Sequence, residues 1–184
     1  TRPPFSFVTD GFLVIGDAAC LTKPMNGEGI TSAWVQSTPA ADVVAYALKD
    51  NKYPTKEALW KINYLYQTKE GAEFAGLRAL LVGAVAMSKE DNDYLYANGI
   101  IFKSDDEEVK GSVAGNLIKG VLKRKFSYSA LSKLLKASNT GTKLTKHYKR
   151  YPLTPEGYFK WKKKALSLWE KVGSMADNIT DAEE

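Results

Sequence analysis

The sequence predicts a mainly α-helical chain with one short strand near residues 12–15. Two observations predict this fold. Helix-start signals recur along the chain, each a Ser or Thr followed within three residues by an acid or a proline, at Thr55, Ser88, Ser104 and Thr154. The one strand signal is the apolar run 12–15, closed by Gly16 and Asp17, which is typical of a buried strand. Because one strand cannot form a sheet, we expect its neighbours to lie in a missing part of a longer protein.

The helix boundaries follow from local breakers. A helix is expected to start near Gly27, to kink or restart at Pro39, and to end at residues 50–52. Gly71 is expected to bend or divide the next helical segment, and Gly173 is a plausible stop for the last helix. The apolar stretch 71–87 is too short to span a bilayer comfortably, so we interpret it as a buried helix.

Composition limits the chemistry available to the 184 residues. The single cysteine, Cys20, excludes an internal disulfide framework and an iron–sulfur cluster held by this chain alone. The single histidine, His147, excludes a multi-histidine metal site, and no metal site is expected. A net charge of +5 is mild, so no nucleic-acid partner is expected. The chain begins at Thr1 without an initiator Met, and we expect a cytoplasmic fragment, with association at a membrane surface left open.

The segment 11–30 carries the most specific chemical pattern. It consists of an apolar strand, an acidic turn, a loop with Pro24, and a glycine-rich helix start. Asp17 at the strand end can accept hydrogen bonds from sugar or polyol hydroxyls. A helix start presents free backbone N–H groups and a partial positive charge. Gly27 and Gly29 would let a ligand approach that backbone closely. By itself, Gly-Asp is most often only a turn, so the surrounding pattern carries the hypothesis.

This pattern resembles the second FAD-binding motif of the p-hydroxybenzoate hydroxylase-like flavoproteins. More narrowly, it is similar to that of the geranylgeranyl reductases and the electron-transfer-flavoprotein dehydrogenases. The resemblance is tight over residues 11–34 and weaker beyond. It implies that residues 1–35 are the C-terminal piece of an FAD-binding domain and that residues 36–184 are a helical C-terminal region. The full-length protein would then combine an α/β FAD-binding fold with this helical region.

The resemblance also implies a set of cofactor-binding residues: Gly16, Asp17, Pro24, Gly27, Glu28, Gly29 and Ile30. Asp17 would bind the ribityl hydroxyls of FAD, Pro24 would lie beside the isoalloxazine ring, and the amides of residues 27–30 would face its N1–C2=O edge. The dinucleotide fingerprint GxGxxG, which would bind the ADP half of FAD, is absent. We therefore expect FAD to be shared with the missing N-terminal part and not retained by this chain. No catalytic residue is assigned.

Three functions are weighed. The first is a geranylgeranyl reductase-like enzyme that delivers hydride from reduced FAD to an isoprenoid double bond. The second passes electrons from an electron-transfer flavoprotein through FAD to a quinone. The partner would accordingly be an isoprenoid lipid, an electron-transfer protein or a quinone. The third is a non-enzymatic helical binding domain that uses its basic segments 119–125 and 143–150. In the second segment, we interpret His147 as part of a solvated basic surface, and a patch that docks a lipid headgroup or a partner is the alternative. For Cys20, a small loop residue and a redox or gating role both stay open.

Overall fold

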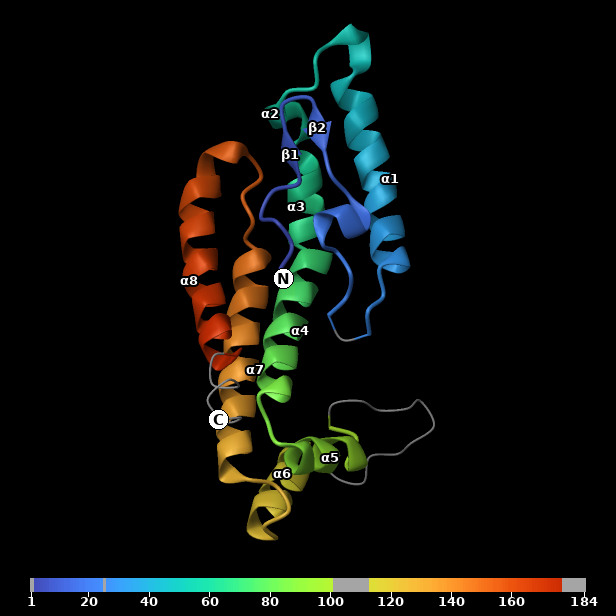
Figure 1. Ribbon diagram of the computed structural model, residues 1–184. Helices are drawn as coiled ribbons and strands as arrows, with labels where there is room; N and C mark the ends of the chain where they lie inside the picture. Colours follow the sequence, from blue (N-terminus) through green and yellow to red (C-terminus); the bar gives the residue numbers. More distant parts are fainter. Residues whose placement is uncertain (1, 25, 101–112, 177–184) are drawn as a thin grey trace.

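The computed structural model describes residues 2–24, 26–100 and 113–176, and their fold is mainly helical (Figure 1). The prediction of the fold class is therefore confirmed. The α-helices are α1 (Ile30–Ala47), α2 (Lys56–Leu59), α3 (Lys61–Gln67), α4 (Glu70–Val85), α5 (Lys89–Ala97), α6 (Val113–Leu122), α7 (Tyr128–Tyr148) and α8 (Tyr158–Ala176). Short 3-10 helices are η1 (Gly16–Ala19), η2 (Lys49–Asn51) and η3 (Pro155–Gly157), and the strands are β1 (Val8–Thr9) and β2 (Phe12–Leu13).

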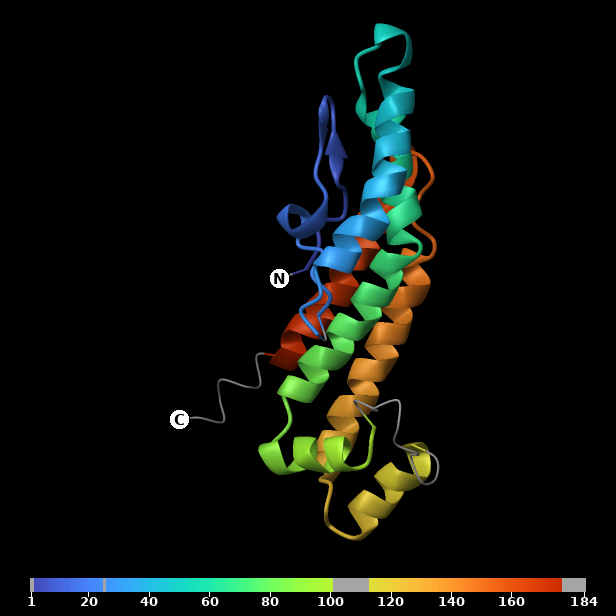
Figure 2. The same cartoon turned by 90° about the vertical axis from the view of Figure 1, so that its right-hand side faces the viewer.

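Helices α4 and α7 form the centre of the molecule and lie side by side along most of their length (Figures 1 and 2). Small residues allow this close packing. A β-carbon at Gly141 would lie 2.9 Å from the backbone oxygen of Gly76, and a β-carbon at Gly83 would overlap that of Ala137. Helix α8 packs against both α4 and α7. Below this bundle, α5 and α6 share a smaller apolar cluster centred on Leu95 and Phe126.

The N-terminal segment is fixed to the helices by a buried core and by polar contacts. The Phe7 side chain is 1% exposed, and its backbone N–H donates to Asn63 Oδ1 of α3 at 2.8 Å. The Tyr151 hydroxyl donates to the backbone oxygen of Phe5 at 2.7 Å. Trp161 of α8 packs edge-on against the Phe5 ring. These contacts hold the segment that precedes η1 in one position relative to the bundle.

The strand prediction was only partly right. Strand β2 exists, but it pairs antiparallel with β1 of the same chain, with Thr9 opposite Phe12. The expectation that this strand finds no partner within the chain is therefore wrong, and its Phe12 side chain is 56% exposed in the part of the chain that the structure describes. A tight turn at Asp10 and Gly11 explains the local pairing. Gly11 takes φ +68°, which favours glycine, and Asp10 Oδ1 accepts from the backbone N–H of Lys56 at 2.7 Å.

Two of the predicted helix caps are confirmed. The Thr55 side chain accepts a hydrogen bond from the backbone N–H of Ala58, and the Ser88 side chain accepts one from Asp91. Thr154 precedes η3 without a side-chain cap, and Pro155 opens that turn before α8 begins. Ser104 lies outside the described residues.

Other predicted boundaries moved by a few residues. Helix α1 begins at Ile30, because Gly27 has φ +72° and cannot belong to a right-handed helix. The same helix runs continuously through Pro39 and does not restart there. Helices α3 and α4 separate at residues 68–69, where Lys69 leaves helical geometry, just before Gly71. The stop expected at Gly173 is wrong, since α8 continues to Ala176.

Candidate functional site

The turn that carries the acidic motif packs directly on helix α1. Gly16 opens η1 with φ +62°, and its backbone N–H donates to Gln36 Oε1 of α1 at 3.1 Å. Gln36 is fully buried. A β-carbon at Gly16 would lie 3.3 Å from that of Ala33, so both conformation and space favour glycine here. Leu21, which is fully buried, anchors the far side of the turn. The strand end and the helix are therefore held against each other.

Asp17 and Gly29 are brought into contact although they are far apart in the motif. Asp17 is exposed, and its Oδ1 accepts a hydrogen bond from the Thr22 hydroxyl at 3.0 Å. A β-carbon added at Gly29 would overlap Oδ1 and would lie 3.0 Å from Oδ2. Gly29 itself has ordinary right-handed backbone angles. A side chain at Gly29 would therefore displace the Asp17 carboxylate from its place against the start of α1.

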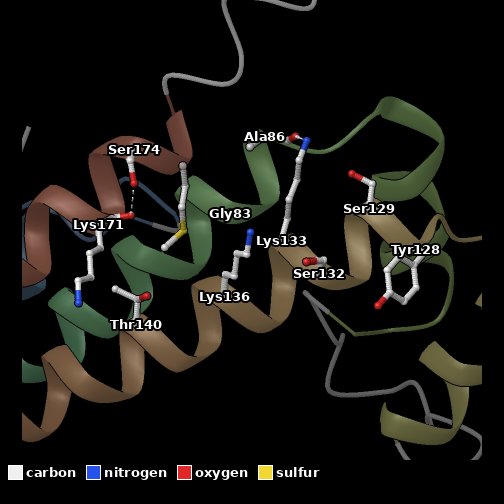
Figure 3. Close-up of a pocket in the computed structure, with 11 residues that line it drawn as sticks. Gly83, Ala86, Tyr128, Ser129, Ser132, Lys133, Lys136, Thr140, Lys171 and Ser174 are labelled. Carbon is white, nitrogen blue, oxygen red and sulfur yellow. Dashed lines mark hydrogen bonds between the residues drawn. The ribbon is translucent and has the colours of Figure 1, made fainter.

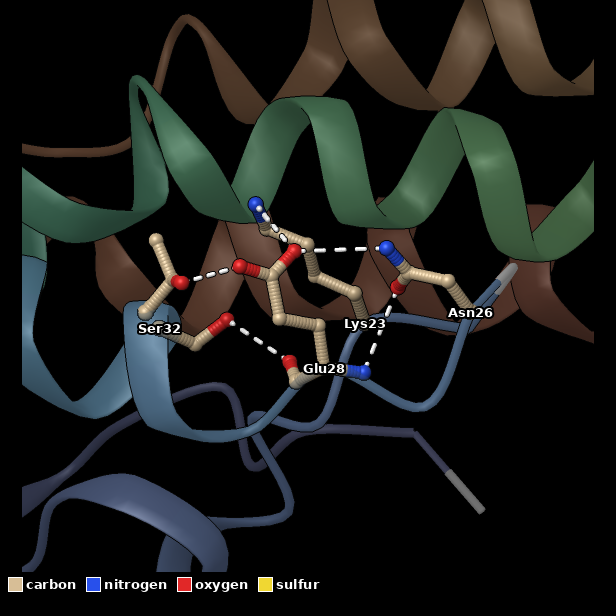
Figure 4. Close-up of polar contacts among 5 residues, drawn as sticks. Lys23, Asn26, Glu28 and Ser32 are labelled. Carbon is tan, nitrogen blue, oxygen red and sulfur yellow. Dashed lines mark hydrogen bonds and ion pairs between the residues drawn. The ribbon is translucent and has the colours of Figure 1, made fainter. Parts of the chain in front are cut away.

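Glu28 organises the loop before the helix (Figure 4). Its carboxylate forms an ion pair with Lys23 at 3.2 Å and accepts hydrogen bonds from Asn26 Nδ2 and from the Thr31 hydroxyl. Hydrogen bonds from Thr31 first, then from Lys23 and Asn26, lower the pKa of Glu28 below its ordinary value. The Ser32 hydroxyl approaches the Glu28 backbone oxygen at 3.5 Å. The side chain of Glu28 therefore stabilises the loop, and so does its backbone, whose N–H donates to Asn26 Oδ1 at 3.2 Å and whose oxygen accepts from the backbone N–H of Lys23 at 2.9 Å.

The other motif residues lie on the open side of the same segment. Gly27 would find no atom within 4 Å of an added β-carbon, so its requirement is the left-handed backbone alone. Pro24 is partly exposed in the loop. Ile30, the first residue of α1, is 83% exposed. Cys20 is an exposed free thiol whose φ of +55° closes η1, and its backbone N–H donates to the Asp17 backbone oxygen at 2.9 Å.

This arrangement fits the part of FAD that the motif would bind. A polyol chain needs an exposed acceptor, and Asp17 provides one. An electron-rich ring edge needs N–H donors, and the α1 start has no side-chain cap in front of it. Gly29 keeps the space between these two features free of a side chain. The structure thus brings Asp17 next to the start of α1, at the two ends of the segment that holds the seven predicted site residues.

Sequence reasoning missed an exposed apolar surface on α1. We define the outer face of α1 as Ile30, Trp34, Val35 and Tyr46. Trp34 is 74% exposed and Tyr46 is 76% exposed. Ile30 and Trp34 lie four residues apart and Val35 and Tyr46 eleven residues apart, spacings that place each pair on one side of a helix. Ile30 and Trp34, one helical turn apart, are both exposed beside the motif.

The prediction that His147 lies on a solvated basic surface is wrong. The imidazole stacks on Trp161 with ring centroids 5.0 Å apart, and its Nε2 lies 2.9 Å from the Trp161 backbone oxygen. Trp161 Nε1 in turn donates to the His147 backbone oxygen at 3.0 Å. Burial lowers the pKa of His147, and the nearby positive charges of Lys164 and Arg150 lower it further. His147 therefore belongs to the α7–α8 packing.

Comparison with known proteins points to a reductase. No family model matches the chain. A curated protein that does match is the digeranylgeranylglycerophospholipid reductase of Sulfolobus acidocaldarius, 25% identical over 169 residues. The match covers 88% of this chain and 37% of the archaeal protein, so the chain spans little more than a third of that relative. This distant similarity supports a relationship to geranylgeranyl reductases. The motif of residues 11–34 suggests the same relationship. None of the described helices is long and apolar enough to cross a membrane.

Proposed function

We propose that the chain is the C-terminal part of an FAD-dependent reductase of the geranylgeranyl reductase type. The observation that carries the proposal is the contact between the Asp17 carboxylate and Gly29 at the start of α1. That contact joins the two halves of the motif into one surface with an acceptor and a helix N-terminus side by side. The similarity to a curated archaeal reductase supports the same conclusion.

Each motif residue has a defined task in this proposal. Asp17 accepts hydrogen bonds from the ribityl hydroxyls, and Thr22 holds one of its oxygens in place. The backbone N–H groups at Gly29 and Ile30 face the pyrimidine edge of the ring, where the α1 dipole stabilises negative charge. Gly16 fixes the turn on Gln36, and Glu28 fixes the loop. Pro24 lies beside the ring system.

When bound, reduced FAD supplies a hydride to one carbon of an isoprenoid double bond, and a proton completes the other carbon. The chain itself contributes binding, orientation and charge stabilisation. We assign no residue of this chain as the proton donor. The substrate class proposed is an isoprenoid lipid, which the protein would reach from the aqueous side of a membrane surface.

The outer face of α1 is assigned to contact with the rest of the enzyme. It continues directly from the motif, since Ile30 belongs to both. A cofactor held on one side by residues 16–30 needs a second wall and an ADP site, which a longer chain would provide. The archaeal relative is long enough to hold such a domain, because the match uses 37% of it. Burial of Trp34 and Tyr46 would stabilise that contact.

The proposal is tested with the full-length protein that contains this chain. Purified protein should carry FAD and, after chemical reduction under anaerobic conditions, should add two hydrogens per double bond to a geranylgeranyl lipid, as measured by mass spectrometry. The matched control is the same protein with Asp17→Ala, assayed with and without added FAD. A protein that binds no FAD, or an FAD protein that leaves isoprenoid double bonds unchanged while it reduces a quinone, would overturn the reductase assignment.

A further inference from the structure

A second candidate site lies between α4, α7 and α8, away from the flavin motif. It is a cavity of about 810 Å³ whose lining includes no residue of the segment 11–34. Gly83 of α4 and Ala86, which follows the end of α4, contribute to its wall, and the remaining lining comes from α7 and α8. Figure 3 shows the side chains of Lys133 and Lys136 extending from α7 and that of Lys171 from α8. The cavity therefore lies within the helical bundle, where a ligand could reach the three lysine side chains.

The lining is cationic and rich in hydroxyl groups. It contains three lysines and five hydroxyl side chains but no carboxylate, and its polar members are Tyr128, Ser129, Ser132, Lys133, Lys136, Thr140, Lys171 and Ser174. Surface lysines are usually interspersed with acids, which neutralise them. Here the whole segment 128–176 has eleven Lys and Arg residues against two Glu. This segment, which includes both helices that line the cavity, thus has a net charge of +9, against +5 for the whole chain.

Several of these groups are available for a ligand. Lys136 and Lys171 form no ion pair with any described carboxylate. Lys133 is positioned by a 2.5 Å hydrogen bond to the Ala86 backbone oxygen at the end of α4, which leaves two of its N–H groups free. Thr140 is 8% exposed, and its hydroxyl makes no hydrogen bond with another described residue. A hydroxyl group and ammonium groups that line one cavity suit an acceptor with several oxygens.

We propose that this cavity binds a phosphate monoester group, carried either by a lipid headgroup or by a small soluble metabolite. Phosphate presents multiple acceptor oxygens and a charge close to −2, which matches several ammonium donors and hydroxyl donors around one cavity. The site is independent of the proposed flavin function. A cofactor-free chain should therefore bind phosphate monoesters even if the flavin proposal fails. Likewise, the flavin proposal stands even if no phosphate monoester binds.

The test measures glycerol 3-phosphate binding to the 184-residue chain by calorimetry at about 0.15 M salt, where exposed charges are screened. We expect saturable binding of one molecule per chain. Lys136→Gln should weaken it roughly tenfold, the usual loss for a charge-assisted hydrogen bond. Thr140→Val should weaken it by a smaller factor. The matched control is Lys143→Gln, which removes the same charge from an exposed position of α7 outside the cavity and should leave the affinity within about twofold.

Vesicle flotation distinguishes the two sources of phosphate. Binding to phosphatidylcholine vesicles that contain phosphatidic acid, displaced by glycerol 3-phosphate and lost in Lys136→Gln, assigns a lipid headgroup. Binding of glycerol 3-phosphate without vesicle binding assigns a soluble metabolite. The proposal is overturned if glycerol 3-phosphate does not bind, or if Lys143→Gln weakens binding as much as Lys136→Gln, since a diffuse basic surface would then explain the effect. Circular dichroism of each variant establishes that the helices are intact.

Discussion

The Asp17 carboxylate occupies the space that a side chain at Gly29 would need. The two residues come from the opposite ends of a loop, and the loop itself is held by Glu28 and Lys23. Two glycines of the motif therefore serve different purposes. Gly27 supplies a left-handed backbone, and Gly29 leaves room for a carboxylate at a helix start.

This relationship predicts a specific coupling between the two positions. Gly29→Ala should displace the Asp17 carboxylate, which is the mobile end of an exposed side chain, so the cost in folding stability should stay below about 1 kcal/mol. FAD affinity of the full-length protein should nevertheless fall, by about as much as in Asp17→Ala. In a double-mutant cycle, the second substitution should add little to the first. Additive losses of affinity, measured by fluorescence titration, would show that the two residues act separately.

The contact between α4 and α7 predicts opposite effects for two Gly→Ala substitutions. Gly141→Ala places a β-carbon 2.9 Å from the Gly76 backbone oxygen, so the helices must move apart at a cost of about 1–3 kcal/mol. Gly173→Ala is the matched control, because no atom lies within 4 Å of its added β-carbon inside α8. It should stabilise the chain by up to about 1 kcal/mol. Urea unfolding of the chain measures both, and a stable Gly141→Ala variant would refute the close approach.

The hydrogen bonds of Asp91 predict that its replacement lowers the folding stability where α5 meets α7. It is 8% exposed, and its carboxylate accepts hydrogen bonds from the backbone N–H of Ser127 at 2.6 Å, from the Ser127 hydroxyl at 2.8 Å and from the Ser88 hydroxyl at 3.1 Å. It thereby joins the start of α5 to the start of α7. Asp91→Ala should cost about 1.5–3 kcal/mol in thermal unfolding. Asp93→Ala, at an exposed position of the same helix, should cost far less.

The lowered pKa of His147 predicts that the folding stability depends on pH. Its pKa is lowered in the folded chain, mainly by burial, so the unfolded chain binds the proton more readily. The stability contributed by neutral His147 is complete above the ordinary pKa of about 6.5 and is lost as pH falls from there toward the folded pKa. His147→Gln should remove this part of the pH dependence. Because the chain has one histidine, proton NMR follows its titration directly, and a folded pKa at or above 6.5 would contradict the account.

The sequence predicted features set by local chemistry. The caps at Thr55 and Ser88 were found because each depends on a side chain and a backbone N–H three residues away. The motif residues were assigned from their order along the chain, and their role in binding FAD stays a prediction. Strand β1 was missed, since two residues at Val8–Thr9 show no alternating pattern. Gly173 was interpreted as a stop, although a glycine at an exposed position inside a helix costs only about 1 kcal/mol.

Features that depend on tertiary contacts could not be predicted. The contact between Asp17 and Gly29 requires the path of the loop, which no residue pattern describes. The place of His147 depends on Trp161, a residue of the next helix. The phosphate cavity draws Lys136 and Lys171 from different helices, and the sequence shows them only as separate basic segments.

The most direct test of the central claim is the FAD affinity of the full-length protein with Asp17→Ala, compared with Asp42→Ala. Both substitutions remove an exposed acid from the region of η1 and α1, but only Asp17 contacts the helix start. The account predicts a loss of about ten- to hundredfold in FAD affinity for Asp17→Ala, because a charge-assisted acceptor typically contributes about 1.5–3 kcal/mol. It predicts no change for Asp42→Ala. Equal affinities for both variants and the unaltered protein would show that Asp17 is only a turn residue and that this segment does not hold the flavin.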